Sequence, residues 1–404
     1  MATRERPIAI LDSTLREGEQ TPGVCFPPHA KLAIGDALER LGVDVIEAGH
    51  PRVSPSIEAA VRGLGARSYK AQVAAHARSV QEDVDLALDC GVDFLGIFYC
   101  VSRDRLGGVF KRSLGDAIDQ IASTIRYARE RNPELTIRYT PEDTVRSHWD
   151  NVVEAAAAAV EAGADVISIA DTTGHMVPGV RSLYDFVSRL RDDLDARGAR
   201  PRLAVHCHDD RGLALANALD AYRAGIDVID ATVLGLGERA GLVDLASLLA
   251  VLAVDLEEQA AAGWDLTVLP ELYRLVSTYS GVTIPAGHPV VGENAFTHCA
   301  GVHTHAATKN AVHYQSLDPA LFGREMLVSL DHMSGLSSVR YALDKLGEEA
   351  DVELATRVLE QVKRVGEVGR TVGKAELRDI VRWCRRATDA EATPVAVGGP
   401  AGSR

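Results

Sequence analysis

The sequence predicts an α/β protein in which a closed (β/α)8 barrel, the TIM-barrel fold, is followed by a mainly helical C-terminal region. Short runs rich in β-branched residues alternate with segments of helical spacing. A glycine and an aspartate recur together where a helix gives way to a strand, and clusters of polar residues follow the strands. The chain has 404 residues, enough for a large core and more than one domain.

Eight short runs have the length and composition of buried parallel strands. They are residues 8–13, 43–48, 70–75, 94–99, 136–140, 166–170, 202–207 and 228–233. Segments rich in alanine, leucine and arginine separate them and have the spacing of amphipathic helices. These segments include residues 29–41, 80–90, 114–131, 149–162, 180–196, 213–224 and 243–257.

Four of the helix-to-strand junctions share the pattern glycine–apolar–aspartate–apolar. Gly42, Gly91, Gly163 and Gly225 open these junctions, and glycine is the usual residue where a helix ends in the left-handed conformation. Eight such β–α units fit a closed parallel barrel. A doubly wound open sheet is the alternative, but it usually has fewer strands and a glycine-rich first turn, which this sequence lacks.

The pattern changes after the eighth predicted helix. We therefore expect a catalytic barrel over residues 1–262 and a helical region over 263–388. Within that region, residues 264–288 and 335–386 have helical patterns, and the stretch around residues 289–304 is irregular. Residues 389–404 are rich in glycine, proline, serine and alanine and are expected to be a disordered tail.

Composition restricts the class of protein. The net charge of −14 disfavours nucleic acid as a partner. No apolar run approaches the roughly 20 residues of a membrane span, and the N-terminus lacks the apolar core of a secretory signal. The six cysteines contain no C-x-x-C pair, which disfavours a disulfide framework or a cysteine-rich zinc site. We expect a cytoplasmic protein that does not interact with membranes.

Two histidines on the seventh predicted strand indicate a metal site. His206 and His208 are two residues apart, so their side chains point to the same side of a strand. Two imidazoles and one carboxylate make an open, three-ligand metal site. The segment after the first strand offers Asp12, Glu17 and Glu19. In a closed barrel only strand 8 separates strands 1 and 7, and both end at the catalytic face.

Five segments together resemble a known family. They are LDSTLREGEQ at 11–20, IADTTG at 169–174, HCHDD at 206–210, GLGERAG at 235–241 and GENAFTHCAGVH at 292–303. In this order they resemble the metal-dependent enzymes that condense acetyl-CoA with 2-oxo acids, namely the homocitrate, 2-isopropylmalate and citramalate synthases. Glu17, Leu242 and Tyr314 are most similar to the homocitrate synthase branch.

The resemblance implies a catalytic centre. Glu17, His206 and His208 are implied as ligands of one divalent metal ion, for which Zn²⁺, Mn²⁺, Mg²⁺ or Co²⁺ are candidates. Arg16 is implied to stabilise the developing alkoxide, since its guanidinium stays charged. The family assigns the base to a glutamate and a histidine assisted by a tyrosine. The matching residues are Glu142, His303 and Tyr314.

The resemblance also implies the substrates and the assembly. Acetyl-CoA is the expected co-substrate, with Gly235, Gly237, Glu238 and Arg239 near its cleft. The 2-oxo acid is expected to be held by Gln20, His76, Arg138, Thr140 and Thr172. In this family the base comes from the partner subunit, which implies a homodimer with composite active sites.

Two departures from the family pattern leave the 2-oxo acid open. Arg52 stands where homocitrate synthases usually have a small or apolar residue, and Ala204 replaces a glutamate. 2-Oxoglutarate is the first expectation. If both positions lie near the barrel mouth, an added cation and a missing anion would suit a more negative acid than 2-oxoglutarate. Arg52 would then bind the substrate, and oxaloacetate or phosphonopyruvate is the alternative acid. Arg52 facing solvent or a CoA phosphate is the other interpretation.

Other functions are compatible with the same barrel. A 2-isopropylmalate or citramalate synthase would use the same chemistry on another acid. A hydroxymethylglutaryl-CoA-type lyase needs a cysteine in the loop after strand 8, where residues 236–241 have none. A sensor without activity would be expected to have lost a ligand or base, and none is missing. Asp12 is either a structural residue of the first loop or a group behind the metal ligands.

Overall fold

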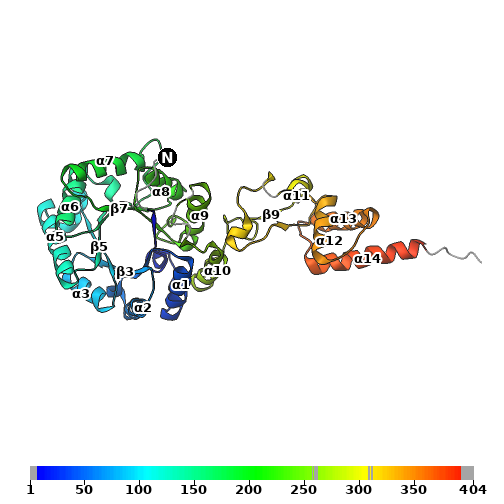
Figure 1. The fold of residues 1–404 in the computed structure, drawn as a ribbon, viewed down its shortest axis with the longest axis horizontal. Helices are drawn as coiled ribbons and strands as arrows, with labels where there is room; N and C mark the ends of the chain where they lie inside the picture. The colour runs from blue at the N-terminus through cyan, green and yellow to red at the C-terminus, as the bar shows by residue number, and fades with distance from the viewer. Residues whose placement is uncertain (1–6, 257, 259–262, 308–309, 311–312, 393–404) are drawn as a thin grey trace, which may run out of the picture. The chain divides into compact units, whose positions relative to one another are not determined.

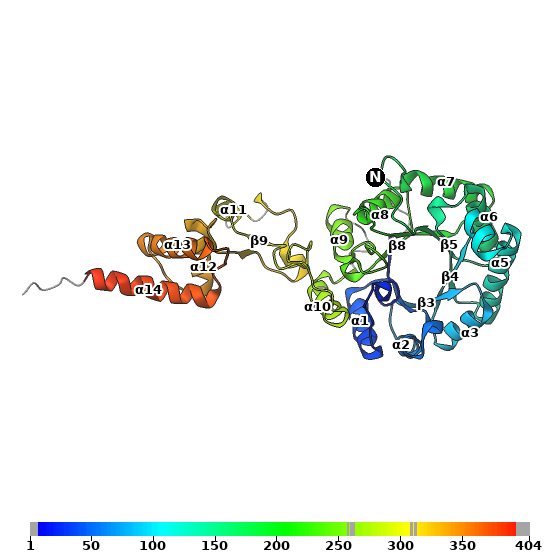
Figure 2. The same cartoon turned by 180° about the vertical axis from the view of Figure 1, so that it is seen from behind.

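The computed structural model describes residues 7–256, 258, 263–307, 310 and 313–392. The chain forms two compact units (Figures 1 and 2). The first comprises Met1–Pro285 and Pro289–Val291, and the second comprises Ala286–His288 and Gly292–Arg404. The division therefore falls later than residue 262. The reason is that helix α10 (Leu269–Ser280) packs on helix α1 (Pro28–Leu41), where Arg40 and Glu271 form an ion pair of 2.7 Å.

The first unit is a closed, all-parallel barrel whose strands follow chain order from β1 to β8, and β8 pairs with β1. This confirms the predicted fold. The strands are β1 (Ala9–Asp12), β2 (Val45–Gly49), β3 (Gln72–Arg78), β4 (Phe94–Cys100), β5 (Thr136–Glu142), β6 (Val166–Asp171), β7 (Arg202–Cys207) and β8 (Val228–Ala231).

Helices surround the barrel, as Figure 1 shows. After α1 they are α2 (Pro55–Gly65), α3 (Gln81–Asp89), α4 (Arg103–Arg105), α5 (Leu114–Arg131), α6 (Trp149–Glu161), α7 (Leu183–Ala196), α8 (Ala214–Arg223), α9 (Leu245–Ala250) and α10. The predicted helix 180–196 starts at Leu183 because Ser182 accepts a hydrogen bond from the Asp185 amide as an N-cap. The predicted helix 243–257 is shorter, and α9 passes into a π-helical turn at Val251–Asp255.

Each of the four glycine–aspartate junctions ends a helix and fixes the register of the strand that follows. All four glycines have positive φ, as predicted for helix ends. The four aspartates share a second feature, because each carboxylate accepts a hydrogen bond from a backbone amide of the preceding strand. The pairs are Asp44 with Ile10, Asp93 with Val73, Asp165 with Ile137, and Asp227 with Leu203, at 2.7–2.8 Å. Strands β2, β4, β6 and β8 are thereby fixed in register with their predecessors.

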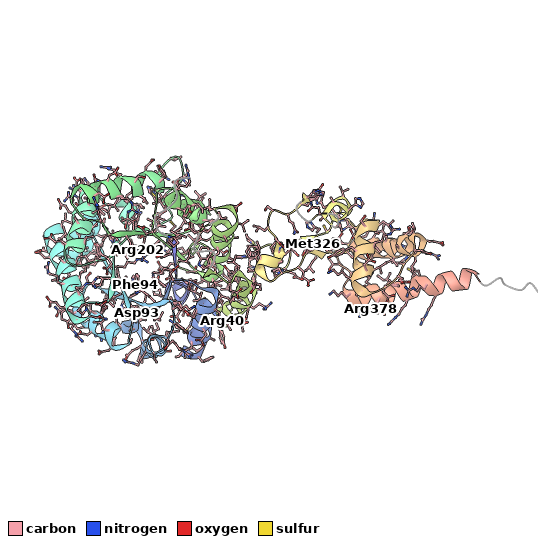
Figure 3. All side chains as sticks on the ribbon, viewed as in Figure 1. Arg40, Asp93, Phe94, Arg202, Met326 and Arg378 are labelled. Atoms are coloured by element: carbon pink, nitrogen blue, oxygen red, sulfur yellow. The ribbon has the colours of Figure 1, made fainter. Side chains whose placement is uncertain are left out.

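An apolar layer fills the barrel interior. It consists of Ala9, Leu11, Val45, Ala74, Phe94, Val166, Ala204 and Val228, which come from seven of the strands. Phe94 is labelled inside the barrel in Figure 3. Ala204 is fully buried in this layer. A glutamate there would have to enter an apolar core, so Ala204 bears on packing and not on charge at the barrel mouth.

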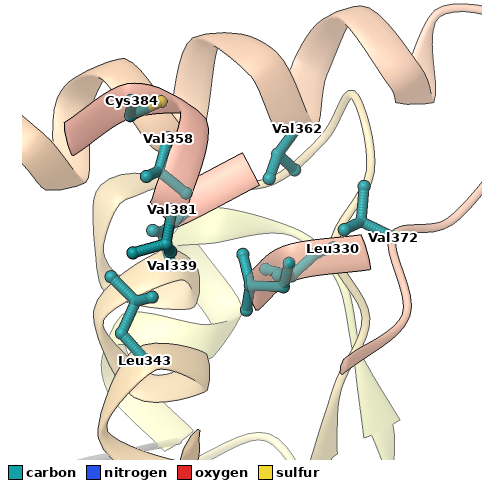
Figure 4. Packing of buried hydrophobic residues seen from close by; sticks show 9 residues of the cluster. Leu330, Val339, Leu343, Val358, Val362, Val372, Val381 and Cys384 are labelled. Atoms are coloured by element: carbon teal, nitrogen blue, oxygen red, sulfur yellow. The ribbon is translucent and has the colours of Figure 1, made fainter. Parts of the chain in front are cut away.

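The second unit is a small helical domain with its own core. Its elements are β9 (Thr297–His298), α11 (Gly301–Ala307), β10 (Leu327–Val328), α12 (Leu336–Leu346), α13 (Val352–Gly366) and α14 (Lys374–Ala392). Figure 4 shows side chains from the last three helices packing together; the core is Leu330, Val339, Leu343, Val358, Val362, Val372, Leu377, Val381 and Cys384. The helical pattern predicted over residues 335–386 is confirmed.

The C-terminal tail lies largely outside the described residues. α14 continues to Ala392, so it includes the first residues of the segment 389–404, which was expected to be a tail. Residues 393–404 are not among those described. Among the helices that the structure does describe, none is both long and apolar enough to span a membrane.

Candidate functional site

The loop after β1 is shaped by a buried carboxylate. Asp12, at the end of β1, accepts hydrogen bonds from the backbone amide and the hydroxyl of Thr14, both at 3.0 Å. The Thr14 hydroxyl in turn accepts from the Val233 amide at 2.8 Å, which ties this loop to the end of β8. Burial raises the pKa of Asp12 to about 7. These contacts support a structural role for Asp12.

The two histidines of β7 converge as expected from their spacing. His206 and His208 are both buried, and their Nε2 atoms lie 3.3 Å apart. Cys207, between them, is fully buried on the opposite side of the strand. Burial and the neighbouring His206 lower the pKa of His208 to about 4, so its imidazole is neutral near pH 7. A neutral imidazole is the form that binds a metal ion.

Glu17 and Arg16 lie beside these imidazoles. Glu17 Oε1 is 4.0 Å from His208 Nε2, and its other oxygen forms an ion pair with Arg16. Burial raises the pKa of Glu17, but Arg16 and the two histidines outweigh it and lower the pKa below its usual value. Arg16 also binds Glu47 of β2 through Nε at 2.8 Å. Arg16 therefore lies between two buried carboxylates, which fix its orientation.

Asp230 of β8 supports the site from behind. Its carboxylate accepts two hydrogen bonds from Arg138, at 2.9 and 2.6 Å, and lies 2.9 Å from His206 Nδ1. Burial raises the pKa of Asp230, but Arg138 and His206 hold it below its ordinary value. Because Asp230 is ionised, His206 donates from Nδ1 and presents its Nε2 lone pair to His208.

The two imidazoles fit a bound cation. With His206 protonated on Nδ1, any neutral tautomer of His208 leaves a buried polar atom unsatisfied, because His208 Nδ1 has no hydrogen-bond partner in the structure. Two nitrogens that bind one zinc ion at about 2.0–2.1 Å in tetrahedral geometry are about 3.3–3.4 Å apart, and the observed separation is 3.3 Å. Glu17 faces Arg16, so no three acidic, histidine or cysteine side chains in the described ranges already form a complete ligand set.

A cavity of about 330 Å³ collects these groups at the carboxyl ends of the strands. Eleven of the residues predicted for the site line it: Arg16, Glu17, Gln20, His76, Arg138, Thr140, Glu142, Thr172, His206, His208 and Glu238. Gln20 reaches Glu17 at 2.8 Å when its amide is oriented so that the nitrogen donates. The barrel thus brings together residues that are far apart in sequence.

Several of these side chains already have partners within the protein. Arg138 is buried, and besides Asp230 it donates to the Ser168 hydroxyl at 2.6 Å. Glu142 forms an ion pair of 2.7 Å with Arg105. The Thr172 hydroxyl accepts a hydrogen bond from the Asp143 amide at 3.1 Å. A ligand of Arg138 or Glu142 would share these side chains with their present partners.

Arg52 and most of the residues expected near CoA lie outside the cavity lining. Arg52 is exposed, whereas the next residue, Val53, lines the cavity. Arg239 binds Asp210 at 2.8 Å and the Thr172 carbonyl at 2.6 Å. Gly235 and Gly237 form the turn after β8.

This turn depends on its glycines. A Cβ at Gly241 would lie 1.8 Å from the Gly235 carbonyl oxygen, and the φ of Gly241 is +86°. The Gly237 amide donates to the Thr21 hydroxyl at 2.9 Å, which joins the turn after β8 to the loop after β1. The glycines of this turn are therefore needed for close packing beside the site, independently of any role in binding CoA.

His303 and Tyr314 belong to the second unit. Their rings stack with centroids 4.3 Å apart, so the structure brings this predicted pair together. Both side chains are exposed. His303 lies on α11, a helix of only seven residues. Glu142, the third predicted member of the base, is in the first unit.

Three buried residues that organise the site were given no role from the sequence. Glu47 orients Arg16, and Asp230 orients His206 and Arg138. Lys31 of α1 is fully buried and donates to the carbonyl oxygens of Leu15, at 2.6 Å, and Ala48, at 3.2 Å. The available signal was a charged residue inside an otherwise apolar strand or helix face, which indicates a buried pair.

Comparisons with known proteins identify the class. Residues 7–276 match the family model described as HMGL-like. Residues 290–370 match the model described as homocitrate synthase post-HMGL domain-like. The chain therefore belongs to the HMGL-like family, whose members are typically metal-dependent.

Individual relatives within this family indicate the type of enzyme. The homocitrate synthase of Pyrococcus horikoshii is 42% identical over 354 residues, covering 88% of this chain and 94% of that protein. The homocitrate synthase of Methanopyrus kandleri is 37% identical, covering 93% and 92%. A 2-isopropylmalate synthase of Methanocaldococcus jannaschii is 33% identical, covering 93% and 71%. The chain is a homocitrate synthase-like acyltransferase, as predicted.

Solved structures agree on the fold. The hydroxymethylglutaryl-CoA lyase of Pseudomonas aeruginosa superimposes with a TM-score of 0.59 at 23% identity, covering 69% of this chain and 95% of that one. The HMG-CoA lyase of Brucella melitensis gives a TM-score of 0.56 at 22% identity, covering 68% and 99%. At these identities the likeness shows the barrel fold alone.

Proposed function

We propose that the chain condenses acetyl-CoA with a dicarboxylic 2-oxo acid, 2-oxoglutarate before others, to give homocitrate and free CoA. One observation carries the proposal. The Nε2 atoms of His206 and His208 lie 3.3 Å apart, and both imidazoles line the same cavity as Glu17 and Arg16. The similarity to homocitrate synthases supports the choice of acid.

Glu17, His206 and His208 would hold one divalent metal ion. For Glu17 this requires a turn of its carboxylate from Arg16 toward the imidazoles, since Oε1 is now 4.0 Å from His208 Nε2. When bound, the ion supplies Lewis acidity to the 2-oxo group. Two histidines and one carboxylate accept Zn²⁺, Mn²⁺ or Co²⁺, and Mg²⁺ less readily because it prefers oxygen ligands.

The side chains around the ligands account for the remaining steps. A base takes a proton from the acetyl methyl group, and the resulting enolate carbon bonds to the carbonyl carbon of the oxo acid. Arg16 stabilises the alkoxide that forms, because Glu47 already fixes its orientation. Water then cleaves the thioester, and the CoA thiol leaves.

We assign the base to Glu142 and His303, with Tyr314 beside the imidazole. The stacking of His303 on Tyr314 supports their acting together. These two are on the second unit and Glu142 is on the first. From the family resemblance, we propose that the partner's second unit completes the site in a homodimer. Mixing an inactive Arg16→Ala variant with an inactive His303→Ala variant should restore activity if the sites are composite. No recovery after subunit exchange would contradict this assembly.

The test of the reaction is release of CoA thiol from acetyl-CoA by metal-loaded protein. The acids to compare are 2-oxoglutarate, oxaloacetate, phosphonopyruvate, pyruvate and 2-oxoisovalerate. The highest kcat/KM with 2-oxoglutarate is expected. A preference for 2-oxoisovalerate would make the chain a 2-isopropylmalate synthase. Thiol release that needs no oxo acid would indicate a hydrolase or lyase and contradict condensation.

A further inference from the structure

The turn after β8 carries Arg239, an arginine whose side chain reaches two other loops. Its guanidinium binds both oxygens of Asp210, with Nε to Oδ1 at 2.8 Å and Nη2 to Oδ2 at 3.0 Å. The same Nη2 donates to the Thr172 carbonyl oxygen at 2.6 Å. Asp210 lies in the loop after β7, and Thr172 directly follows β6. One side chain therefore joins the loops that follow three neighbouring strands.

The backbone at Arg239 adopts a conformation that arginine rarely takes. Its φ is +57°, in the left-handed region that favours glycine. A residue with a side chain keeps such a conformation only where its surroundings fix it, and such residues are frequent at functional sites. Here the guanidinium makes three hydrogen bonds to other loops, which hold the residue in place. The shape of the turn and the contacts of the Arg239 side chain therefore depend on each other.

The residue before Arg239 contacts Glu17, one of the proposed metal ligands. The backbone amide of Glu238 donates to Glu17 Oε1 at 3.4 Å. This oxygen lies 4.0 Å from His208 Nε2, whereas Oε2 pairs with Arg16. The amide therefore favours the orientation in which Oε1 stays on the side of the histidine. It orients the carboxylate without competing for a cation, because a backbone N–H only donates.

The same turn contacts the end of β7, where His208 lies. The amide of the residue after His208 donates to the Gly241 carbonyl oxygen at 2.8 Å. The ion pair between Arg239 and Asp210 is a second link between these two segments. Among the described residues, no hydrogen-bond partner reaches His208 Nδ1, whereas His206 has a carboxylate behind its ring. The position of the His208 imidazole therefore depends on how its backbone is held.

We propose that Arg239 is a positioning residue of the metal site and not a ligand of CoA. It holds the turn after β8 against the loops after β6 and β7. It thereby fixes the Glu238 amide that orients Glu17 and the backbone from which His208 projects. The inference rests on the proposed function, because it takes Glu17 and His208 as metal ligands. Arg239 lies outside the cavity lining, whereas Glu238 lines it.

The test measures the affinity of the metal-free protein for Co²⁺ by calorimetry and the KM for acetyl-CoA of the metal-saturated protein. Arg239→Gln removes the charged group. Arg239→Lys keeps the charge but cannot bind both carboxylate oxygens through a planar fork. Arg200→Gln is the matched control with the same change of charge. The Arg200 side chain is 82% exposed and precedes β7, at the opposite end of the barrel from the cavity.

We expect Arg239→Gln to raise the Co²⁺ dissociation constant about 10- to 100-fold, the range for groups that orient metal ligands. The KM for acetyl-CoA should stay at the wild-type value once the metal is saturating. Arg239→Lys should lose part of the Co²⁺ affinity, and Arg200→Gln should lose none. Charge alone predicts the opposite result, because Arg239 is a cation close to His208 and its removal would tighten Co²⁺ binding.

Two results would overturn the proposal. One is Co²⁺ binding by Arg239→Gln that is unchanged or tighter than in the wild type. The other is a raised KM for acetyl-CoA with wild-type Co²⁺ binding, which would make Arg239 a CoA ligand. A general loss of structure is recognised by the urea midpoint of the metal-free protein. A lowered midpoint in both Arg239 variants would indicate a structural role and would also contradict positioning.

The link through Asp210 is tested by combining substitutions. Asp210→Asn should weaken Co²⁺ binding, and adding Arg239→Gln to it should cost little more, because both changes remove the same contact. Losses that simply add would show that the two side chains act independently, which contradicts a joint hold on the loops.

Failure of the proposed function is recognisable separately. If the wild type binds Co²⁺ but condenses acetyl-CoA with no acid, the proposed reaction is wrong, and the Co²⁺ affinities of the variants still decide the role of Arg239. If the wild type binds no Co²⁺, the metal site itself is wrong and the inference falls with it.

Discussion

The two units contribute to the proposed chemistry in contrasting ways. In the barrel, Arg16 and His206 are packed into buried networks in which each has at least one charged partner. In the second unit, His303 and Tyr314 are exposed, and their described contact is with each other. The barrel residues are oriented by the fold before any ligand binds. The second-unit residues have no such buried charged partner among their described contacts, and in the proposed composite site another surface would cover them.

This contrast predicts different effects for substitutions in the two units. Changes in the barrel set should alter metal binding, stability or both, because the side chains are part of the packed structure. Changes in the second-unit set should alter turnover and leave stability nearly untouched, since exposed positions contribute little to folding.

Loss of a proposed ligand should have the largest effect. We expect His208→Ala to lower kcat/KM by at least about 10³-fold, since removing groups that only support a metal ligand already costs about 10–100-fold. Metal content by mass spectrometry should fall in parallel. His148→Ala, at an exposed position, should retain both metal and activity. A His208→Ala protein with full metal content and activity would show that the metal is bound elsewhere.

Loss of the proposed base should reduce turnover alone. His303→Ala is expected to lower kcat by about 10²- to 10⁴-fold, the range for general acid–base catalysis. Metal content and the urea midpoint should stay at wild-type values. His305→Ala, on the same short helix, is the control and should be nearly fully active. If His303→Ala lost metal or stability, the contrast between the two units would be wrong.

Lys31 should show how much the barrel network contributes to stability. Lys31→Met leaves two carbonyl oxygens and Glu19, which Lys31 pairs with at 2.6 Å, without their buried partner. We expect the free energy of unfolding in urea to fall by about 3–5 kcal/mol. Lys70→Met, at an exposed lysine, should change it by less than about 0.5 kcal/mol. The double variant Lys31→Met, Glu19→Gln should regain part of the loss.

The last prediction concerns the pH dependence of stability. Because burial raises the folded-state pKa of Asp12 from 3.8 to about 7, folding favours its neutral form. Its contribution to stability is complete below about pH 4 and is lost as pH rises toward 7, by at most about 4 kcal/mol. Their neighbours lower the folded-state pKa values of Glu17, Glu47 and Asp230, so these carboxylates have the opposite pH dependence and lose their contribution to stability as pH falls.

The measurement is urea unfolding of the wild type and Asp12→Asn between pH 4 and 8. The wild type should lose stability relative to the variant as pH rises. The informative quantity is how the difference in unfolding free energy between the two proteins changes with pH. The amide of Asp12→Asn alters the Thr14 hydrogen bonds at every pH, so the difference at a single pH is not informative. Parallel curves would show that Asp12 is ionised throughout.

The barrel could be predicted from sequence because its signals are local. Each strand is short and apolar, and Gly42 and its counterparts mark the ends of helices. The convergence of His206 and His208 follows from their spacing on one strand. Asp230 and Arg138 were harder to connect, because 92 residues separate them and only the closed barrel brings them together. The irregular stretch before α12 has no such periodicity, so the prediction that His303 and Tyr314 act together rested on family resemblance, and their stacking could not be predicted.

The aspartates at the starts of β2, β4, β6 and β8 divide the barrel into four strand pairs. Among the strand amides, each carboxylate bonds to one in the strand before it, while Asp165 and Asp227 also pair with Arg129 and Arg191 of the helices. These four strand bonds do not cross from β2 to β3, β4 to β5 or β6 to β7. Insertions or new chain ends placed in the connections from β2 to β3, β4 to β5 or β6 to β7 would keep both strands of every pair adjacent in the chain. The same change made within a pair would separate along the chain two strands that one of these bonds joins, so the boundaries between pairs are the natural places to reconnect this barrel.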